Sequence, residues 1–187
     1  MNFKKTRLLA FILLGIIISG CSMNRYEVPD DVDLIPVSHK AAQELLNKSK
    51  KTLPKNSLVV VSSFVNVDEL KQTSSFGRIV ASQIATAFFN SGYQIKSIEL
   101  PTEFFVQSID GFVQLSPETR AALEKQGASA LIVGVFAPAR NTAYVTARMI
   151  DVDSKKIISS TDFAVPMGMD ARVLLKSRKA GSSMVDQ

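Results

Sequence analysis

The sequence predicts an α/β (α+β) fold, a single domain with a mixed β-sheet of about five strands plus a hairpin, and two to three helices packed on it. Segments 57–65 and 128–137 are nearly continuous apolar runs, typical of central strands that are buried on both faces. Segments 142–151 and 156–165 alternate apolar with polar residues, as antiparallel strands with one wetter face do. Segment 76–91 carries apolar residues at helical spacing. A mixed sheet covered by helices buries all of these segments.

Capping residues indicate where each helix begins and ends. Serine precedes each of three helical patterns, and its hydroxyl accepts hydrogen bonds from the free N–H groups of a first helical turn. Glycine, which adopts left-handed backbone easily, follows two of them. The expected helices are 38–50 with Ser38 as its cap, 76–91 with Ser74 and Ser75 as caps and Gly92 after it, and a short helix from Ser116-Pro117 to Gly127.

A hairpin is expected between a strand over 93–100 and the short third helix. Asp110-Gly111 supplies the type I′ turn that joins two short strands. A hairpin needs one apolar face for its own core, but this one has apolar residues on both faces. The second apolar face therefore indicates that the hairpin is an association surface. The candidate interface residues of the hairpin are Phe104, Phe105, Ile109 and Phe112.

The predicted helix over 76–91 has a second apolar stripe that allows two explanations. Ala81, Ala85 and Phe89 lie opposite its main apolar arc. They are covered either by another element of the chain, such as the 38–50 helix, or by a partner subunit. Phe89 therefore joins the candidate interface residues, and a homo-oligomer is one expected arrangement. Gln83 falls inside the main arc and is expected to bond nearby backbone.

The N-terminal region predicts an exported protein. The apolar run 8–18 follows three basic residues and is shorter than the roughly 20 residues that cross a membrane, so it matches the core of a signal peptide. Cys21, the only cysteine, follows Ser19-Gly20. One explanation is an ordinary signal peptide followed by a free thiol. The other is suggested by Ile18-Ser19-Gly20-Cys21, which resembles the lipobox of bacterial lipoproteins.

The lipobox resemblance implies a lipid anchor on Cys21. In lipoproteins the corresponding cysteine receives a thioether-linked lipid, becomes the N-terminus by cleavage and is then acylated, with palmitate as the expected chain. Several acyl chains together hold a protein firmly on a membrane. Ser22 stands where an aspartate commonly implies retention at the inner membrane, so the resemblance favours the periplasmic face of the outer membrane.

Removal of residues 1–20 changes the charge that bears on partners. The segment contains three basic residues and no acid, so the formal charge falls from +5 to +5 − 3 = +2. This small charge gives no reason to expect nucleic acid as a partner. The expected organisation is a lipoprotein signal peptide at 1–20, a lipidated N-terminus and tether at 21–37, the α/β domain at 38–166, and a weakly structured C-terminal tail at 167–187. Within this tail, the segment 171–176 allows one or two helical turns.

The inventory of catalytic residue types is thin. His39 is the only histidine, and the glycines are isolated rather than gathered in a phosphate loop. The acid pairs Asp30/Asp31 and Asp151/Asp153 stand in the tether and in a hairpin turn, where solvated turn residues are expected. Ser74 and Ser75 are expected to cap a helix and not to bind phosphate. The sequence therefore predicts no enzyme, cofactor or metal site.

Several motifs between residues 38 and 165 resemble the FlgO family. They are Phe64-Val65-Asn66-Val67-Asp68, Ser74-Ser75-Phe76-Gly77-Arg78, and Gly134 with Tyr144-Val145 and Arg148. The resemblance implies an outer-membrane protein with a non-enzymatic role at polar flagella, in or near the ring beneath the outer membrane. Its implied partners are flagellar ring proteins or other envelope proteins.

Two other function classes remain open. Anchored α/β domains also surround channels, so the chain is alternatively an accessory lipoprotein of an envelope secretion or transport complex. A hydrolase or carbohydrate-binding enzyme is the third reading, which the single histidine and the missing motifs disfavour.

Overall fold

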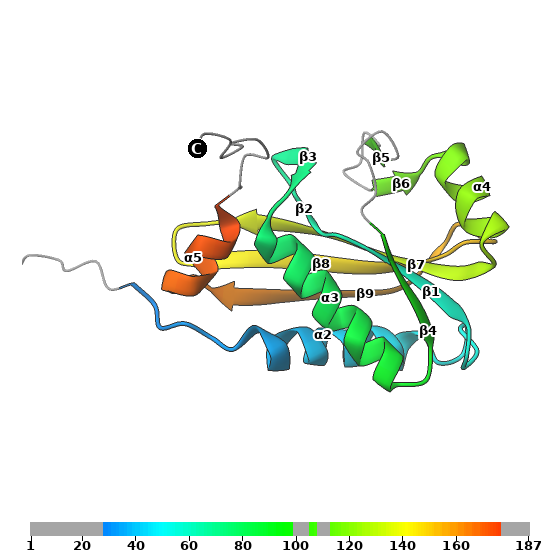
Figure 1. Ribbon diagram of the computed structural model, residues 1–187, viewed down its shortest axis with the longest axis horizontal. Coiled ribbons are helices and arrows are strands. Elements are labelled where there is room, and N and C mark those ends of the chain that lie inside the picture. The colour runs from blue at the N-terminus through cyan, green and yellow to red at the C-terminus, as the bar shows by residue number, and fades with distance from the viewer. Residues whose placement is uncertain (1–27, 99–104, 108–112, 177–187) are drawn as a thin grey trace, which may run out of the picture.

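The computed structural model describes residues 28–98, 105–107 and 113–176. Within them, four helices and nine strands follow one another (Figure 1). The helices are α2 (Leu34–Ser49), α3 (Ser75–Asn90), α4 (Pro117–Lys125) and α5 (Met169–Leu175). The strands are β1 (Leu58–Ser62), β2 (Val65–Asn66), β3 (Glu69–Thr73), β4 (Gln94–Ile98), β5 (Phe105–Gln107), β6 (Val113–Leu115), β7 (Ala128–Pro138), β8 (Thr142–Asp151) and β9 (Ile157–Pro166).

A seven-stranded mixed sheet forms the centre of the fold, and β7 organises it. Along one edge of β7, β1 and then β2 pair with it in parallel. Along the other edge, β8 and then β9 follow as antiparallel neighbours. Strand β4 lies outside β1, and β3 lies outside β2. The mixed sheet and its flanking helices confirm the predicted fold class.

Each face of the sheet carries its own core. On one face, α2 and α3 cover apolar residues of β1, β7 and β8, and α5 packs beside α3 (Figure 1). On the other face, Leu123 of α4 packs with Val60 of β1 and Leu131 of β7. Residues of β1 and β7 therefore alternate between the two cores. This explains why both segments are apolar without interruption.

The sheet has more strands than the sequence predicts, for two reasons. The run 57–65 does not form one strand, because the chain leaves β1 after Ser62 and re-forms β2 at Val65. Strand β3 is polar, with the sequence ELKQT, and pairs only with β2 at the margin of the sheet. A marginal strand of this kind lacks the apolar pattern by which buried strands are found.

Helix α2 begins earlier than predicted. Asp33 caps it by accepting a hydrogen bond from Ile35 N at 2.9 Å, so the cap is not Ser38. Pro36 is accommodated in the first turn, where backbone N–H groups have no helical acceptor. Ser38 lies one turn further on, where it is buried. Residues 34–37, which the sequence assigns to the tether, are thus helical.

Phe64 connects β1, α3 and β7 through two glycines. Its backbone N donates to Gly77 O in the first turn of α3, over 3.3 Å. A Cβ atom on Gly77 would lie 2.1 Å from Phe64 O, and one on Gly134 would lie 2.4 Å from the Phe64 ring. Beside them, Phe76 and Phe136 pack edge to face, with ring centroids 5.3 Å apart. We call Phe64, Gly77 and Gly134 the glycine clasp.

Helix α5 is fastened to the N-terminal segment and to the β7–β8 turn. Asp31 Oδ1 accepts from Asp170 N at 2.9 Å and from Ala171 N at 3.5 Å, which caps the helix from the N-terminal segment. Arg172 donates to Met167 O and, over 2.8 Å, to Arg140 O in the β7–β8 turn. The weakly structured tail predicted after Pro166 therefore contains a docked helix of two turns, which overlaps the segment 171–176 where the sequence allows a short helix.

The glycine clasp predicts that Gly134→Ala destabilises the domain. The added methyl group overlaps the Phe64 ring, and overpacking of this kind costs about 1–3 kcal/mol. Urea unfolding followed by circular dichroism measures the loss. Phe64→Leu in the Gly134→Ala background should recover part of it, because leucine is smaller.

Gly92→Asn is the matched control for Gly134→Ala. Gly92 has a φ of +87° and nothing within 4 Å of a Cβ position, and asparagine tolerates the left-handed region. Its midpoint should fall by less than that of Gly134→Ala, because its cost is limited to backbone strain and includes no overlap with another side chain. Equal midpoints for Gly134→Ala and this control would show that the clasp is not tight.

Candidate anchoring and interaction sites

The predicted anchor and the described domain are separated by a short stretch of chain. Cys21 and the predicted signal peptide lie outside the described residues, which begin at Val28. Within the described ranges, the structure contains no helix with both the length and the apolar character needed to cross a membrane. The tether segment predicted at 21–37 includes Asp31, which is bonded to α5, and the first turn of α2.

The predicted hairpin is present as a separate two-stranded sheet. Strands β5 and β6 pair antiparallel, with Phe105 opposite Leu115 and Gln107 opposite Val113. Phe105 belongs to β5, whereas Phe104, Ile109, Phe112 and the turn residues lie outside the described residues. The hairpin as an element is thus confirmed, and its role as an interface stays a prediction.

The second apolar stripe of α3 is not a surface. Ala81 and Ala85 are buried within the core on the α2–α3 face, while Phe89 is 66% exposed. Helix α2 packs along α3, and Ser38 Oγ donates to Gln83 Oε1 over 2.8 Å. The stripe is therefore covered within the chain, and of its three residues only Phe89 remains available to a partner. Gln83 bonds a side chain of α2, not the nearby backbone that the sequence favours.

The serines before α3 and α4 act as structural groups. Ser74 Oγ accepts from Gly77 N at 3.2 Å, which confirms the predicted cap. Ser75 is instead the first residue of the helix, and its hydroxyl accepts from Arg78 Nη2 at 3.3 Å. Before α4, Ser116 Oγ accepts from Thr119 N, with Pro117 at the first helical position as predicted. These hydroxyls satisfy free ends of helices.

One member of each acidic pair has a structural role. Asp151 Oδ1 accepts from Ser154 N at 2.7 Å and from Ser154 Oγ at 2.6 Å, which closes the β8–β9 turn as the sequence predicts. Asp31 is not a solvated turn residue, because it caps α5. Its role could not be found from sequence spacing, since its partner Asp170 lies 139 residues away. Among the described residues, no group of three His, Cys, Asp or Glu side chains could hold a metal ion.

Two ionisable groups have displaced pKa values, each with a local cause. Burial raises the pKa of Tyr93, which lies in the α3–β4 connection and whose hydroxyl donates to Leu53 O at 3.5 Å. Hydrogen bonds from its own backbone N–H and from the Ser116 hydroxyl lower the pKa of Glu118 in the first turn of α4. Lys55 Nζ lies 4.9 Å from the centroid of the Tyr93 ring, which is a cation–π contact. Catalytic pairs instead join two titratable groups in a cleft.

A small hollow lies on α4, beside the β8–β9 turn. It encloses about 130 Å³ and is lined by Pro117, Arg120, Ala121, Glu124 and Lys155. Pockets for small molecules generally enclose about 300–1,000 Å³. Arg120 Nε and Glu124 Oε1 form an exposed ion pair at 2.6 Å across it. The hollow is therefore too small and too open to be a substrate site.

The family-like motifs fall into two structural groups. Phe64, Gly77 and Gly134 meet in the glycine clasp. Tyr144 and Arg148 lie on β8, where the odd-numbered residues from 143 to 149 face the core beneath α2 and α3. Tyr144 and Arg148 therefore lie on the opposite face of the sheet, where Tyr144 is exposed. The first group explains how this fold is packed, and the second faces outward.

The comparisons with known proteins agree with this architecture. The C-terminal domain of LpoB from Salmonella enterica superposes with a TM-score of 0.50 at 16% identity, over 73% of this chain and 100% of that domain. The same domain from Escherichia coli gives a TM-score of 0.50 and 16% identity over the same shares. At this identity the likeness concerns the fold. None of the curated proteins compared with the chain matches it.

The family comparison is more specific than the structural one. The FlgO protein family matches residues 39–170, which run from the second turn of α2 into the start of α5. The match includes all three motifs that resemble the family and the whole seven-stranded sheet. Because it covers more than half of the chain, the protein belongs to the FlgO family.

Proposed function

We propose that this protein is a non-enzymatic lipoprotein of the outer membrane that supports assembly of the flagellar basal body and its outer-membrane ring. Membership of the FlgO family is the observation that carries the proposal. Cys21 is its acylated anchor residue, and the domain stands on the periplasmic face of the membrane. The family resemblance supports the flagellar role, and the lipobox-like Ile18-Ser19-Gly20-Cys21 supports the anchor.

The side chains of the described domain support a structural role over a catalytic one. Asp31 and Ser74 hold helix ends, Asp151 closes a turn, and Arg120 and Glu124 pair with each other at the surface. Each of these polar groups has a neighbour that accounts for it. A catalytic site instead gathers titratable groups in a cleft and displaces their pKa values there.

Deletion of the gene tests the flagellar role. The deletion strain should swim poorly and lose basal bodies with an intact outer ring, and the intact gene supplied in trans should restore both. Soft-agar spreading and electron microscopy of isolated basal bodies are the measurements. Normal swimming together with a defect in secretion would instead favour an accessory lipoprotein of an envelope secretion or transport complex.

Replacement of the anchor residue tests lipidation. Cys21→Ser removes the only thiol, so precursor or soluble periplasmic protein should replace the membrane-bound form. Fractionation and mass spectrometry of the N-terminal peptide measure the change. Ser22→Ala, next to it, should stay in the membrane fraction. Normal membrane retention of Cys21→Ser would refute the anchor.

Charge introduced into the hairpin tests its role as an association surface. Phe105→Asp with Ile109→Asp should leave the domain folded and impair ring assembly and motility, because burying a carboxylate in an apolar contact is costly. Val67→Asp with Ile157→Asp is the matched control, since both side chains are 45% exposed on other elements. Unfolding of the hairpin variant would show that the hairpin belongs to the core, and normal swimming would place the interface elsewhere.

A further inference from the structure

Exposed apolar side chains gather where α5 meets the N-terminal segment. The described residues include nine large apolar side chains that are exposed, and four of them lie in residues 28–35 or on α5. The four are Val28, Ile35, Met169 and Val173. Met169 and Val173 are 66% and 62% exposed and stand four residues apart, so they share one face of α5.

Helix α5 is apolar on its inner side as well. Ala171 is buried, and Leu174 and Leu175 pack against the core shared with α2 and α3. A helix at the edge of a water-soluble domain needs only one apolar side. The outward pair of Met169 and Val173 therefore has no role in the packing of this domain.

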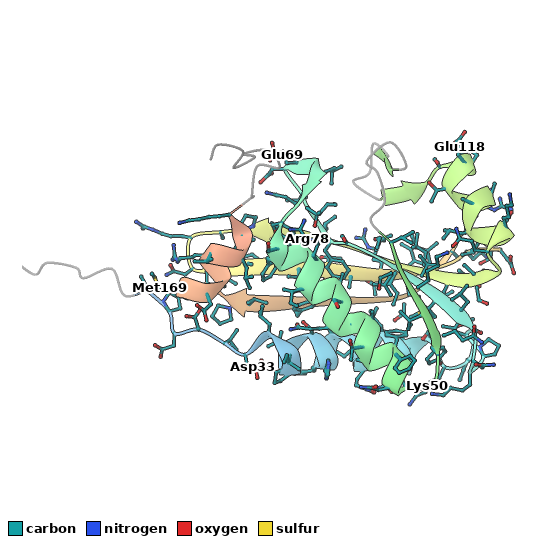
Figure 2. All side chains as sticks on the ribbon, viewed as in Figure 1. Asp33, Lys50, Glu69, Arg78, Glu118 and Met169 are labelled. Atoms are coloured by element: carbon teal, nitrogen blue, oxygen red, sulfur yellow. The ribbon has the colours of Figure 1, made fainter. Side chains whose placement is uncertain are left out.

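The position of this surface in the molecule is well defined. Asp31 and Arg172 fasten α5 to the N-terminal segment and to the β7–β8 turn. Figure 2 shows Met169 at one end of the long axis and Glu118 of α4 towards the other. The outward face of α5 thus covers an end of the domain, beside the segment through which the chain enters it.

The length of the intervening chain brings this end close to the anchor residue. Cys21 and Val28 are seven residues apart, and each residue spans at most about 3.3–3.6 Å. Val28 therefore lies within about 25 Å of Cys21, whatever path the chain takes. With Cys21 in a membrane, the domain cannot move far from the lipid surface.

We propose that the end of the domain formed by Val28, Ile35 and α5 rests on the lipid surface that holds the anchor, with Met169 and Val173 among the headgroups. The proposal rests on the proposed lipidation of Cys21. Apolar side chains on the outer face of a helix suit the boundary between headgroups and acyl chains. Asp30, Asp33 and Asp170 are exposed at the same end and outnumber Lys176, so the contact depends on apolar burial and not on attraction to anionic lipid. In this orientation, α4 and the β8–β9 turn point away from the membrane.

The composition of the chain makes the orientation directly measurable. It contains no tryptophan and one cysteine. The mature chain from Cys21 onward, carrying Met169→Trp, can be coupled through its thiol to a maleimide lipid in phosphatidylethanolamine–phosphatidylglycerol vesicles. The indole should then emit at shorter wavelength than in the uncoupled protein, and brominated acyl chains should quench it.

Phe89→Trp is the matched reporter at a distance from α5. Phe89 is also 66% exposed, but it lies at the end of α3 from which the chain turns into β4. Quenching of the Met169→Trp protein should exceed that of the Phe89→Trp protein by at least about twofold, as interfacial burial of one end requires. Val173→Trp should behave like Met169→Trp, which guards against a local effect of one substitution.

The possible outcomes separate this proposal from the anchor itself. Equal quenching at residues 89 and 169, or none at 169 and 173, would overturn the orientation. The maleimide bond replaces natural acylation, so this result does not depend on how the cell treats Cys21. Conversely, membrane retention of Cys21→Ser in cells would refute the anchor. The vesicle measurement would still show whether the α5 end contacts lipid.

Discussion

The packing of the Phe64 ring on the bare backbone of Gly134 is the constraint on which the rest of the domain depends. Phe64 lies between β1 and β2, so the position of its ring determines how both strands align on β7. The same residue bonds Gly77 O, which brings the first turn of α3 within a distance that no side chain would allow. One aromatic ring and two glycines therefore set the positions of the sheet centre and α3, one of its two long covering helices, relative to each other.

The long axis of the domain separates two chemically different ends. At one end, the N-terminal segment, the β7–β8 turn and α5 are joined by Asp31 and Arg172. At the other, α4 and the β8–β9 turn enclose a small hollow with an ion pair. This asymmetry suits the proposed attachment through Cys21, in which one end approaches the membrane while the other end points away from it. The fastening of α5 makes the first end a rigid face.

The likeness to the LpoB domains extends over most of the chain at an identity of 16%. Shared folds at such low identity carry information about packing and little about chemistry. Membership of the FlgO family is more informative, since its match includes the motif residues that make the glycine clasp and those that face outward from β8. The interaction chemistry of this protein therefore has to be sought on its surfaces, where β8, Phe89 and the α5 end offer distinct candidates.

The sequence by itself determined the fold class, most element positions and the chemical character of the domain. Continuous apolar strands, capping serines and glycines after helices are local patterns, and Ser116-Pro117, Gly92 and the 142–151 strand lie where those patterns indicate. Tertiary structure decided what depends on residues distant in sequence. Asp31 caps a helix 139 residues away, Phe64 needs two separate glycines, and Ala81 and Ala85 are covered by packing within the chain. Such contacts leave no periodic pattern, because their partners are brought together only when the sheet forms.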